Sequence, residues 1–498
     1  MKKGIHIGWA SRDVSTNDPI PIGGQAHMRI SGGSLDPTTI TVLVMENGGD
    51  YAVFLSGDFT SIEPAFLHEV KQEAEKRIAG FDGSKIMFNA THTHTAPRYQ
   101  RKLGYDKAPT DRVEMADALE YRAFLKQQVT DAVEEAYTGR KPGSFAYGYG
   151  SAAIGLQRRV TFLNDQGAGN TLGNTFGVNG HGVMYGNTGQ DDFDSYEGCT
   201  DANVYFLFTF DEAEQLTGAV INVPCPSQCS EMEEFTSADY WHDTRERIRR
   251  KYGDIYILPQ CAAAGDLSPH LLHGIPARDR QIRLKYGDHP QAQGLVRPWE
   301  YYNRMDIAEK IAAAFDECYQ WAIRETYADV PVVHVTKIVD LERWKVTPQE
   351  YEDAQRNYAV LQEKSFRMTE DPRADFVENT IHSSNLTRCE TVMGNYSKNE
   401  TPVPVEIHVV RIGDIAFTTC PFELYMAYQH RIQARSPFVQ TFMVQLTASD
   451  TAGAVGYLPT ERAAANKGYS AIMFSCKVSP RGGQTLVEET LATLKAIR

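Results

Sequence analysis

The sequence predicts an α/β protein in which large mixed sheets are layered with helices. Short runs rich in β-branched and aromatic residues alternate with amphipathic stretches along nearly the whole chain, a pattern typical of α/β architecture. Near the start, a hairpin, a helix and a further strand predict a β-α-β unit. The chain has 498 residues, enough for a large, elaborated core. We expect one domain over residues 1–498, with 1–340 and 341–498 as possible halves.

The hairpin is the strongest local signal. Asn47-Gly48 separates two β-rich runs, at 39–46 and 51–56, and Asn-Gly between such runs favours a tight turn. An amphipathic run at 61–78 predicts the helix that follows. An apolar run at 85–89 then predicts a strand that ends close to two histidines.

Apolar periodicity and glycine or proline stops predict the other elements. Strands are expected at 204–210, 219–223, 255–258, 405–412, 415–419 and 439–446. Helices are expected at 115–137, 237–251, 299–325, 423–434, 484–497 and in the first half of the polar segment 347–385. Residues 164–189 are dense in glycine and asparagine. They predict a long ordered loop or a lid, with a decorative surface insertion as the alternative.

Composition and charge exclude several classes of function. Apolar residues make up 42% and charged residues 23% of the chain, and the net charge is −14, so nucleic acid is not an expected partner. No run of eighteen apolar residues occurs, and we expect no stable membrane association. The first residues lack the features of a secretory signal. We therefore expect a cytoplasmic protein with a small-molecule substrate, and a homo-oligomer is possible.

Two histidines follow the predicted strand at 85–89, in the segment Thr91-His92-Thr93-His94-Thr95. Residues two apart in an extended segment point the same way, so both imidazoles can face one cavity. Imidazole is the commonest metal ligand, and the ends of strands are the usual place for ligand crevices. The alternative is a pair of histidines that are hydrogen-bonded to the loop backbone.

Two further loops after predicted strands carry candidate groups. In the segment 260–270, Asp266 can orient a neighbouring group, and Ser268 is held by the proline that follows it. A tight aspartate-capped turn is the alternative for this segment. Glu423 is expected in the first turn of a helix, where a carboxylate either caps the helix or faces the crevice at the strand end. Tyr457 lies in a glycine-rich loop, as a packing residue, an oxygen ligand or an acid group.

Taken together, these motifs resemble one family. THTHTAP, GDLSPH, PFE and GYLPT occur in that order, at 91–97, 265–270, 421–423 and 456–460. The chain thereby resembles the neutral (non-lysosomal) ceramidases over nearly all of its length, and Arg158-Arg159 is a softer match. The resemblance implies a ceramidase-like catalytic fold, here without the C-terminal β-sandwich domain that family members commonly add.

The activity that the resemblance implies is zinc-dependent hydrolysis of an N-acyl (amide) bond. Carried over by motif, the zinc ligands fall on His92, Glu423 and the phenolate of Tyr457. His94 matches a histidine beside the metal or the substrate, and Ser268 matches the family's essential active-site serine. Arg158, with Arg159 beside it, most nearly matches a substrate-orienting arginine. The missing β-sandwich and secretion signal favour a small soluble substrate over a membrane lipid.

One position departs from the family pattern. Cys225 stands where the family has its second zinc histidine. A thiolate is a good zinc ligand, so Cys225 is a candidate fourth ligand, which would make the metal-bound water less acidic. Alternatively, Cys225 is a packed thiol, and the site has three protein ligands or has lost its metal.

The mechanism that follows from the resemblance is attack by zinc-activated water. Tyr457 and His94 would stabilise the oxyanion or pass a proton, Ser268 would position the substrate, and Asp266 would support the site. Attack by Ser268 with His94 as its base is the alternative within the same class. Two other functions remain open. One is a glycoside hydrolase that uses the carboxylates Asp58, Asp239, Asp266 and Glu423, and the other is a binding protein that has lost the reaction.

Overall fold

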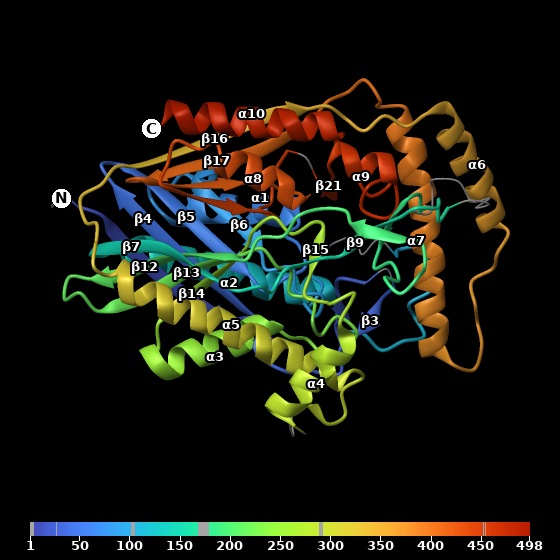
Figure 1. Ribbon diagram of the computed structural model, residues 1–498, viewed down its shortest axis with the longest axis horizontal. Helices are drawn as coiled ribbons and strands as arrows, with labels where there is room; N and C mark the ends of the chain where they lie inside the picture. Colours follow the sequence, from blue (N-terminus) through green and yellow to red (C-terminus); the bar gives the residue numbers. More distant parts are fainter. Residues whose placement is uncertain are drawn as a thin grey trace.

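A computed structural model describes residues 4–25, 27–100, 105–167, 179–287, 292–451, 453 and 455–498. Two sheets pack face to face, and helices cover their outer faces, which gives four layers (Figure 1). The predicted α/β class with large layered mixed sheets is confirmed. The possible division into halves 1–340 and 341–498 stays a prediction. Such a division would place one strand in a different half from the other strands of its sheet.

The larger sheet has eight strands and mixed directions. In spatial order they are β14 (Tyr256–Cys261), β13 (Leu216–Val223), β12 (Asn203–Asp211), β7 (Lys141–Ser151), β1 (His6–Asp13), β4 (Thr39–Asn47), β5 (Asp50–Gly57) and β6 (Ile86–Ala90). The pairs β13–β14 and β5–β6 are parallel and the others are antiparallel. The hairpin between β4 and β5 turns at Gly48 and Gly49, both at positive φ, as the Asn-Gly signal predicts.

The smaller sheet has four strands and lies on the inner face of the larger one. Its order is β16 (Val332–Leu341), β17 (Val403–Ile412), β18 (Ile415–Thr419) and β20 (Gln440–Val444). Aromatic rings join the two sheets: Phe417 stacks on Phe442 with ring centroids 4.2 Å apart and meets Phe54 of β5 at 4.7 Å. Such a layer of interdigitated rings holds the strand ends of both sheets in register with one another.

Helices cover both outer faces. On the larger sheet lie α1 (Pro64–Arg77), α2 (Ala118–Thr138), α3 (Tyr240–Tyr252) and α5 (Pro298–Ala322). On the smaller sheet lie α8 (Met426–Gln433) and α10 (Pro480–Ala496). The other helices are η1 (Gly83–Lys85), α4 (Ile275–Tyr286), α6 (Pro348–Gln362), α7 (Pro372–Tyr396) and α9 (Glu461–Asn466). The short strands are β2 (Pro21–Ile22), β3 (Arg29–Ile30), β8 (Leu156–Gln157), β9 (Arg159–Phe162), β10 (Gly182–Met184), β11 (Phe193–Tyr196), β15 (Leu267–Ser268), β19 (Glu423–Leu424) and β21 (Tyr457–Leu458).

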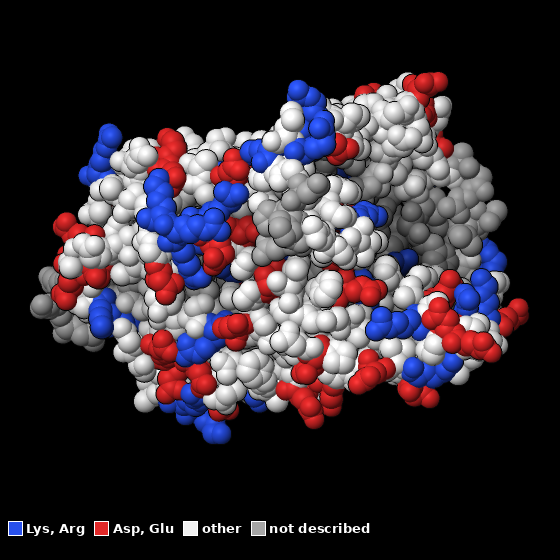
Figure 2. Space-filling model, turned by 90° about the horizontal axis from the view of Figure 1, so that it is seen from below, with Lys and Arg blue, Asp and Glu red and all other residues white. Residues whose placement is uncertain are grey.

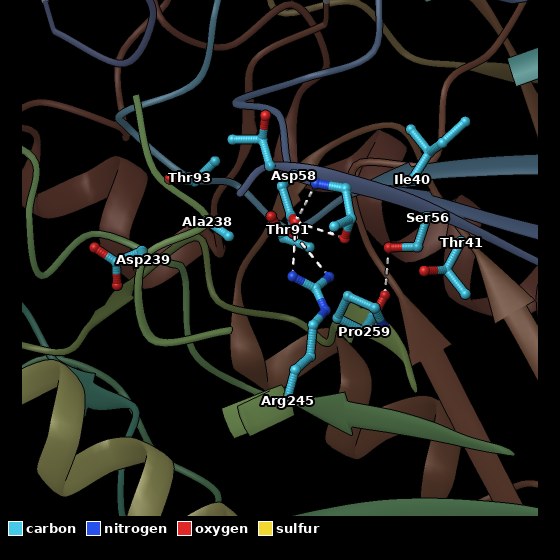
Figure 3. A network of polar contacts seen from close by, with 12 residues as sticks. Ile40, Thr41, Ser56, Asp58, Thr91, Thr93, Ala238, Asp239, Arg245 and Pro259 are labelled. Atoms are coloured by element: carbon cyan, nitrogen blue, oxygen red, sulfur yellow. Dashed lines mark hydrogen bonds and ion pairs between the residues drawn. The ribbon is translucent and has the colours of Figure 1, made fainter. Parts of the chain in front are cut away.

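The larger sheet curls until its two edge strands meet. Asn89 of β6 donates a hydrogen bond to the Pro259 carbonyl of β14 at 3.4 Å. Ser56 of the neighbouring β5 donates to the same carbonyl at 2.5 Å (Figure 3). Residues 445–448, which follow β20, bond to both edges: Gln445 N donates to Cys261 O at 3.0 Å, and Ala448 N donates to Phe88 O at 2.9 Å. The loops after β6, β13, β14, β18 and β20 therefore converge at one place.

Three predicted features differ from the structure. Glu423 lies in β19 and not in the first turn of a helix, because α8 begins only at Met426. Residues 372–396 form the long helix α7. In the segment 347–385, only the first half was expected to be helical. Within the predicted loop 164–189, residues 168–178 lie outside the described residues, and 182–184 form strand β10.

Two surface features bear on the expected partners. Within the described ranges, no helix is long and apolar enough to cross a membrane. On the face drawn in Figure 2, the coloured acidic and basic side chains are interspersed. This pattern gives no support on that face to binding of an extended phosphate backbone.

Candidate active site

The loop after β6 places His92 at the floor of a cavity. Its backbone φ is 64°, an uncommon conformation for a residue other than glycine. Nδ1 lies 2.7 Å from the Thr60 carbonyl, so this nitrogen carries the proton and donates. The other ring nitrogen, Nε2, lies 3.4 Å from Oε2 of Glu423. This arrangement of a histidine is typical of a metal ligand.

Glu423 and Tyr457 are brought together by a two-stranded parallel ladder. They are direct partners in the pairing of β19 with β21. A Cβ on Gly265 would lie 2.3 Å from the Glu423 carbonyl oxygen, so only glycine lets the loop after β14 approach this ladder. Burial would raise the pKa of Glu423, but His92 and Arg158 lower it. Burial and the neighbouring carboxylate raise the pKa of Tyr457 well above its usual value.

Arg158 lies behind this pair as a buried cation. Its Nη2 is 3.6 Å from Oε2 of Glu423 and donates to the hydroxyl of Tyr457 at 3.4 Å and to the Gly265 carbonyl at 2.9 Å. Burial would lower the pKa of Arg158, but Tyr457, Tyr185 and Glu423 raise it well above its usual value. The guanidinium therefore stays charged and fixes both oxygen groups.

His94 lies next to His92 and away from the Thr60 carbonyl. The two Nε2 atoms are 3.3 Å apart. Nδ1 of His94 is 3.1 Å from Oε2 of Glu231, and Gln228 Nε2 lies 3.0 Å from Nε2 of His94. Burial lowers the pKa of His94, although Glu231 opposes this. The neutral ring therefore donates to Glu231 and accepts from Gln228, so both of its nitrogens are occupied.

Ser268 is fully buried in β15. Its Oγ accepts a hydrogen bond from His270 N at 3.2 Å, and it also bonds to Tyr185. His270 Nε2 donates to the Gln228 carbonyl at 3.1 Å and lies 3.6 Å from Glu231. Ser268 therefore stands at the edge of the His94–Glu231 cluster, where it can hold a substrate group but has no contact with an imidazole nitrogen.

Asp266, Arg159 and Cys225 occupy supporting positions. Asp266 accepts from Met426 N at 2.9 Å and from Gln157 at 3.0 Å, which fixes the start of α8. Arg159 is fully buried against Glu197 and points away from Glu423.

Cys225 is packed in the core and does not face His92. Its Sγ lies 3.5 Å from the carbonyl oxygens of Ile154 and Pro226, and burial raises the pKa of this thiol well above its usual value. This arrangement is that of the packed thiol that the sequence left open.

A buried ion pair supports the histidine loop from below. Asp58 pairs with Arg245 of α3 through distances of 2.8 and 3.2 Å and accepts two bonds from Thr39 (Figure 3). Thr91, the residue before His92, donates its N–H to Gly57 O at 3.0 Å. Asp58 is thus fully engaged as a structural group. Asp239 is also engaged, because it accepts from Tyr240 N and Ser230 N at the start of α3.

A cavity of about 490 Å³ opens beside His92 and Glu423. Its walls are largely apolar and come from α1 and from the segments that follow β18 and β20. The apolar members are Ile62, Pro64, Pro421, Leu446, Ala448 and Val455. An apolar cavity with a few polar groups at its floor is typical of a small-molecule site.

The side chains at the floor of the cavity are of types that bind metals, but their number is small. In the described part of the chain, no group of three or more His, Cys, Asp and Glu side chains is arranged to hold a metal. His92 and Glu423 would need the phenol of Tyr457 as a third donor. However, Nε2 of His92 and Oε2 of Glu423 lie 3.4 Å apart, a spacing at which the two atoms can share a proton or bind one metal cation.

Gln228, Glu231, His270 and Tyr185 were not predicted as site residues. They all lie in loops without a regular pattern, and their roles depend on contacts between distant segments. His270 belongs to the GDLSPH motif, which was the one signal available. Gln228 and Glu231 follow Cys225 by three and six residues, and the structure shows that these two, and not Cys225, reach His94.

The solved structures that this chain matches include two ceramidases. The crystal structure of neutral ceramidase from Pseudomonas aeruginosa matches with a TM-score of 0.65 and 16% sequence identity, and the match covers 100% of this chain and 75% of that one. A ceramidase complexed with C2 matches with the same TM-score and identity, over 100% of this chain and 76% of that one. No family model and no curated protein matches the sequence significantly. The chain therefore has a neutral-ceramidase-like fold, as its motifs predicted.

Proposed function

We propose that the protein is a metal-dependent hydrolase of an N-acyl amide bond in a small soluble substrate, with zinc as the metal. The observation that carries this proposal is the contact between the His92 imidazole and the Glu423 carboxylate at the floor of one apolar cavity, with Tyr457 paired to Glu423 beside it. The resemblance to the ceramidases, in motifs and in fold, supports the same class of reaction. When bound there, zinc would supply Lewis-acid activation of a carbonyl and of a water molecule.

The residues around the floor divide the remaining work. His92, Glu423 and Tyr457 would hold the ion. Arg158 keeps Tyr457 and Glu423 in place and puts a positive charge where negative charge develops on the acyl oxygen. The neutral His94 can take a proton only if Gln228 releases its Nε2, so substrate entry and displacement of Gln228 would be linked.

The character of the cavity walls supports one orientation of the proposed substrate. Apolar walls favour the acyl chain on the side of Leu446 and Ala448, and burial of each methylene contributes about 0.8 kcal/mol. Ser268 and Tyr185, which bond to one another beside Arg158, would supply hydroxyl groups for the polar leaving group. Attack by Ser268 itself has less support, because its Oγ contacts no imidazole nitrogen among the described residues.

Glycoside hydrolysis is less well supported, because most of its candidate carboxylates already have structural partners. Asp58, Asp239 and Asp266 each accept hydrogen bonds from structural partners, which leaves Glu423 as the one member of that set facing the cavity. A pair of carboxylates flanking the substrate is needed for this reaction. A binding protein without turnover is the remaining alternative, and the metal experiment distinguishes it.

Removal of zinc is expected to lower the rate at which the purified protein releases amine from N-acyl substrates by at least about 100-fold. The measurement compares chelated protein, untreated protein and chelated protein to which zinc is returned. Metal content is determined on each sample. Zinc bound without turnover on any amide would support the binding protein, and unchanged rates in zinc-free protein would contradict the metal-dependent mechanism.

Replacement Ala448→Phe is expected to raise KM for substrates with long acyl chains by about tenfold or more, because the ring fills the apolar part of the cavity. The effect on an N-acetyl substrate should stay below about threefold. Ala448→Ser, which adds one atom, is the matched control. Equal effects on short and long acyl chains would place the acyl group elsewhere.

A further inference from the structure

A cysteine, a histidine and an aspartate come together outside the candidate active site. Cys199 and Asp201 lie in the loop between β11 and β12, and His430 lies on α8. Sγ of Cys199 is 3.5 Å from Nδ1 of His430, and Nε2 of the same ring is 3.8 Å from Oδ2 of Asp201. Asp201 is buried and is fixed by a hydrogen bond from Asn203 N at 2.9 Å. Nucleophile, imidazole and orienting carboxylate thus stand in sequence, the arrangement that activates a thiol.

The charge state of the ring favours this role. Hydrogen bonds to Asp201 and Cys199 raise the pKa of His430 to about 10, so the imidazole carries a proton at neutral pH. A cation beside a sulfur stabilises the thiolate, which is the reactive form of cysteine. No residue of the candidate active site takes part in these contacts.

A cavity lies beside the cysteine. It has a volume of about 340 Å³, and Cys199 is one of its lining residues. Leu156, Leu271, Leu272 and Tyr196 contribute apolar walls, and His273 is hydrogen-bonded to Tyr196 at 2.6 Å. This space is large enough for a small organic molecule to lie against the thiol.

Cys199 also differs from the other cysteines in its accessibility. The chain has eight cysteines, all within the described residues, and seven of them are buried while Cys199 is partly exposed. A soft electrophile from solvent can therefore reach one sulfur. Because the others are packed in the interior, the product of a first reaction would not pass to a second cysteine of the chain.

We propose that Cys199, His430 and Asp201 form a second nucleophilic site, at which the Cys199 thiolate exchanges with small organic disulfides held in the adjoining cavity. The sulfur of Cys199 attacks one sulfur of the disulfide, the original S–S bond breaks, and the other half leaves as a thiolate that takes up a proton. One disulfide is consumed and one mixed disulfide is formed, so no further oxidant is needed. An added thiol reverses the reaction.

The test is the rate of labelling of the whole protein by 5,5′-dithiobis(2-nitrobenzoate), followed by the released thiolate and by mass spectrometry. The wild type should take up one label, on Cys199, and Cys199→Ser should take up none. His430→Gln should react at least about tenfold more slowly near neutral pH, and Asp201→Asn about threefold more slowly. His273→Gln is the matched control, a histidine of the same cavity that does not contact the sulfur, and should react within about twofold of the wild type.

The wild type alone provides a second measurement, which does not depend on whether the variants fold. Because the disulfide is first held in the cavity beside Cys199, the rate of labelling should level off as the reagent concentration rises. A labelled Cys199→Ser protein, an unchanged rate in His430→Gln, or a rate that rises in proportion to reagent concentration throughout would each overturn the proposal.

Discussion

Replacement His92→Ala is expected to remove bound zinc and to lower amide hydrolysis by at least about 10³-fold. Nδ1 of His92 is bonded to Thr60, so Nε2, which lies beside Glu423 at the cavity floor, is the nitrogen that would bind the metal. Without it, Glu423 and Tyr457 would be the only remaining donors, which is too few for a stable zinc site. Metal content and the rate of amine release are measured on the same sample.

The matched control for this experiment is His94→Gln. Both nitrogens of His94 are engaged, by Glu231 and Gln228, so this variant should keep its zinc while activity falls. Loss of metal in both variants would assign His94 as a ligand and would change the donor set. Full activity in His92→Ala would contradict the metal-dependent mechanism as a whole.

Replacement Arg245→Leu is expected to lower the free energy of unfolding by about 3–5 kcal/mol. The side chain of Asp58 is 0% exposed and that of Arg245 is 5% exposed, so loss of the arginine leaves a carboxylate buried without its cation. The double replacement Asp58→Ala with Arg245→Leu should recover part of the loss, because no unpaired charge remains. Urea unfolding at equilibrium measures each variant.

The control for this pair is an ion pair on the surface. Lys345 and Glu400 lie 2.7 Å apart with side chains that are 55% and 83% exposed, and Lys345→Met should change the free energy of unfolding by less than about 0.5 kcal/mol. If Arg245→Leu also changed the free energy of unfolding by less than about 0.5 kcal/mol, the buried pair would not support the histidine loop.

Local signals were sufficient for much of the fold. The strand at 415–419 and the hairpin at Asn47-Gly48 follow the prediction because short-range periodicity and turn chemistry decide them. Strand β7 was missed because its glycines lower β-propensity. Those glycines make room for α5, since a Cβ on Gly148 would lie 2.4 Å from the Trp321 ring and one on Gly150 would lie 2.7 Å from the Ala314 carbonyl oxygen.

The candidate site could be predicted only where motifs carry it. The motifs predicted that His92, Glu423 and Tyr457 belong to one site, and the structure brings the three residues together. The helix expected at Glu423 was wrong because the glutamate pairs with Tyr457, a partner 34 residues further along the chain that no local window contains. The motif position of Cys225 likewise says nothing about the direction in which its loop turns. That loop buries the thiol and presents Gln228 instead.

The bonding of residues 445–448 to both edges of the larger sheet has a consequence for solubility. Exposed strand edges offer unpaired backbone groups from which one molecule can extend the sheet of another. Here the rims of β6 and β14 are already occupied from within the same chain. Self-association through this sheet would therefore require residues 445–448 to detach from both strand edges first. The rate of slow aggregation should then follow the rate at which this segment opens, which hydrogen exchange can measure.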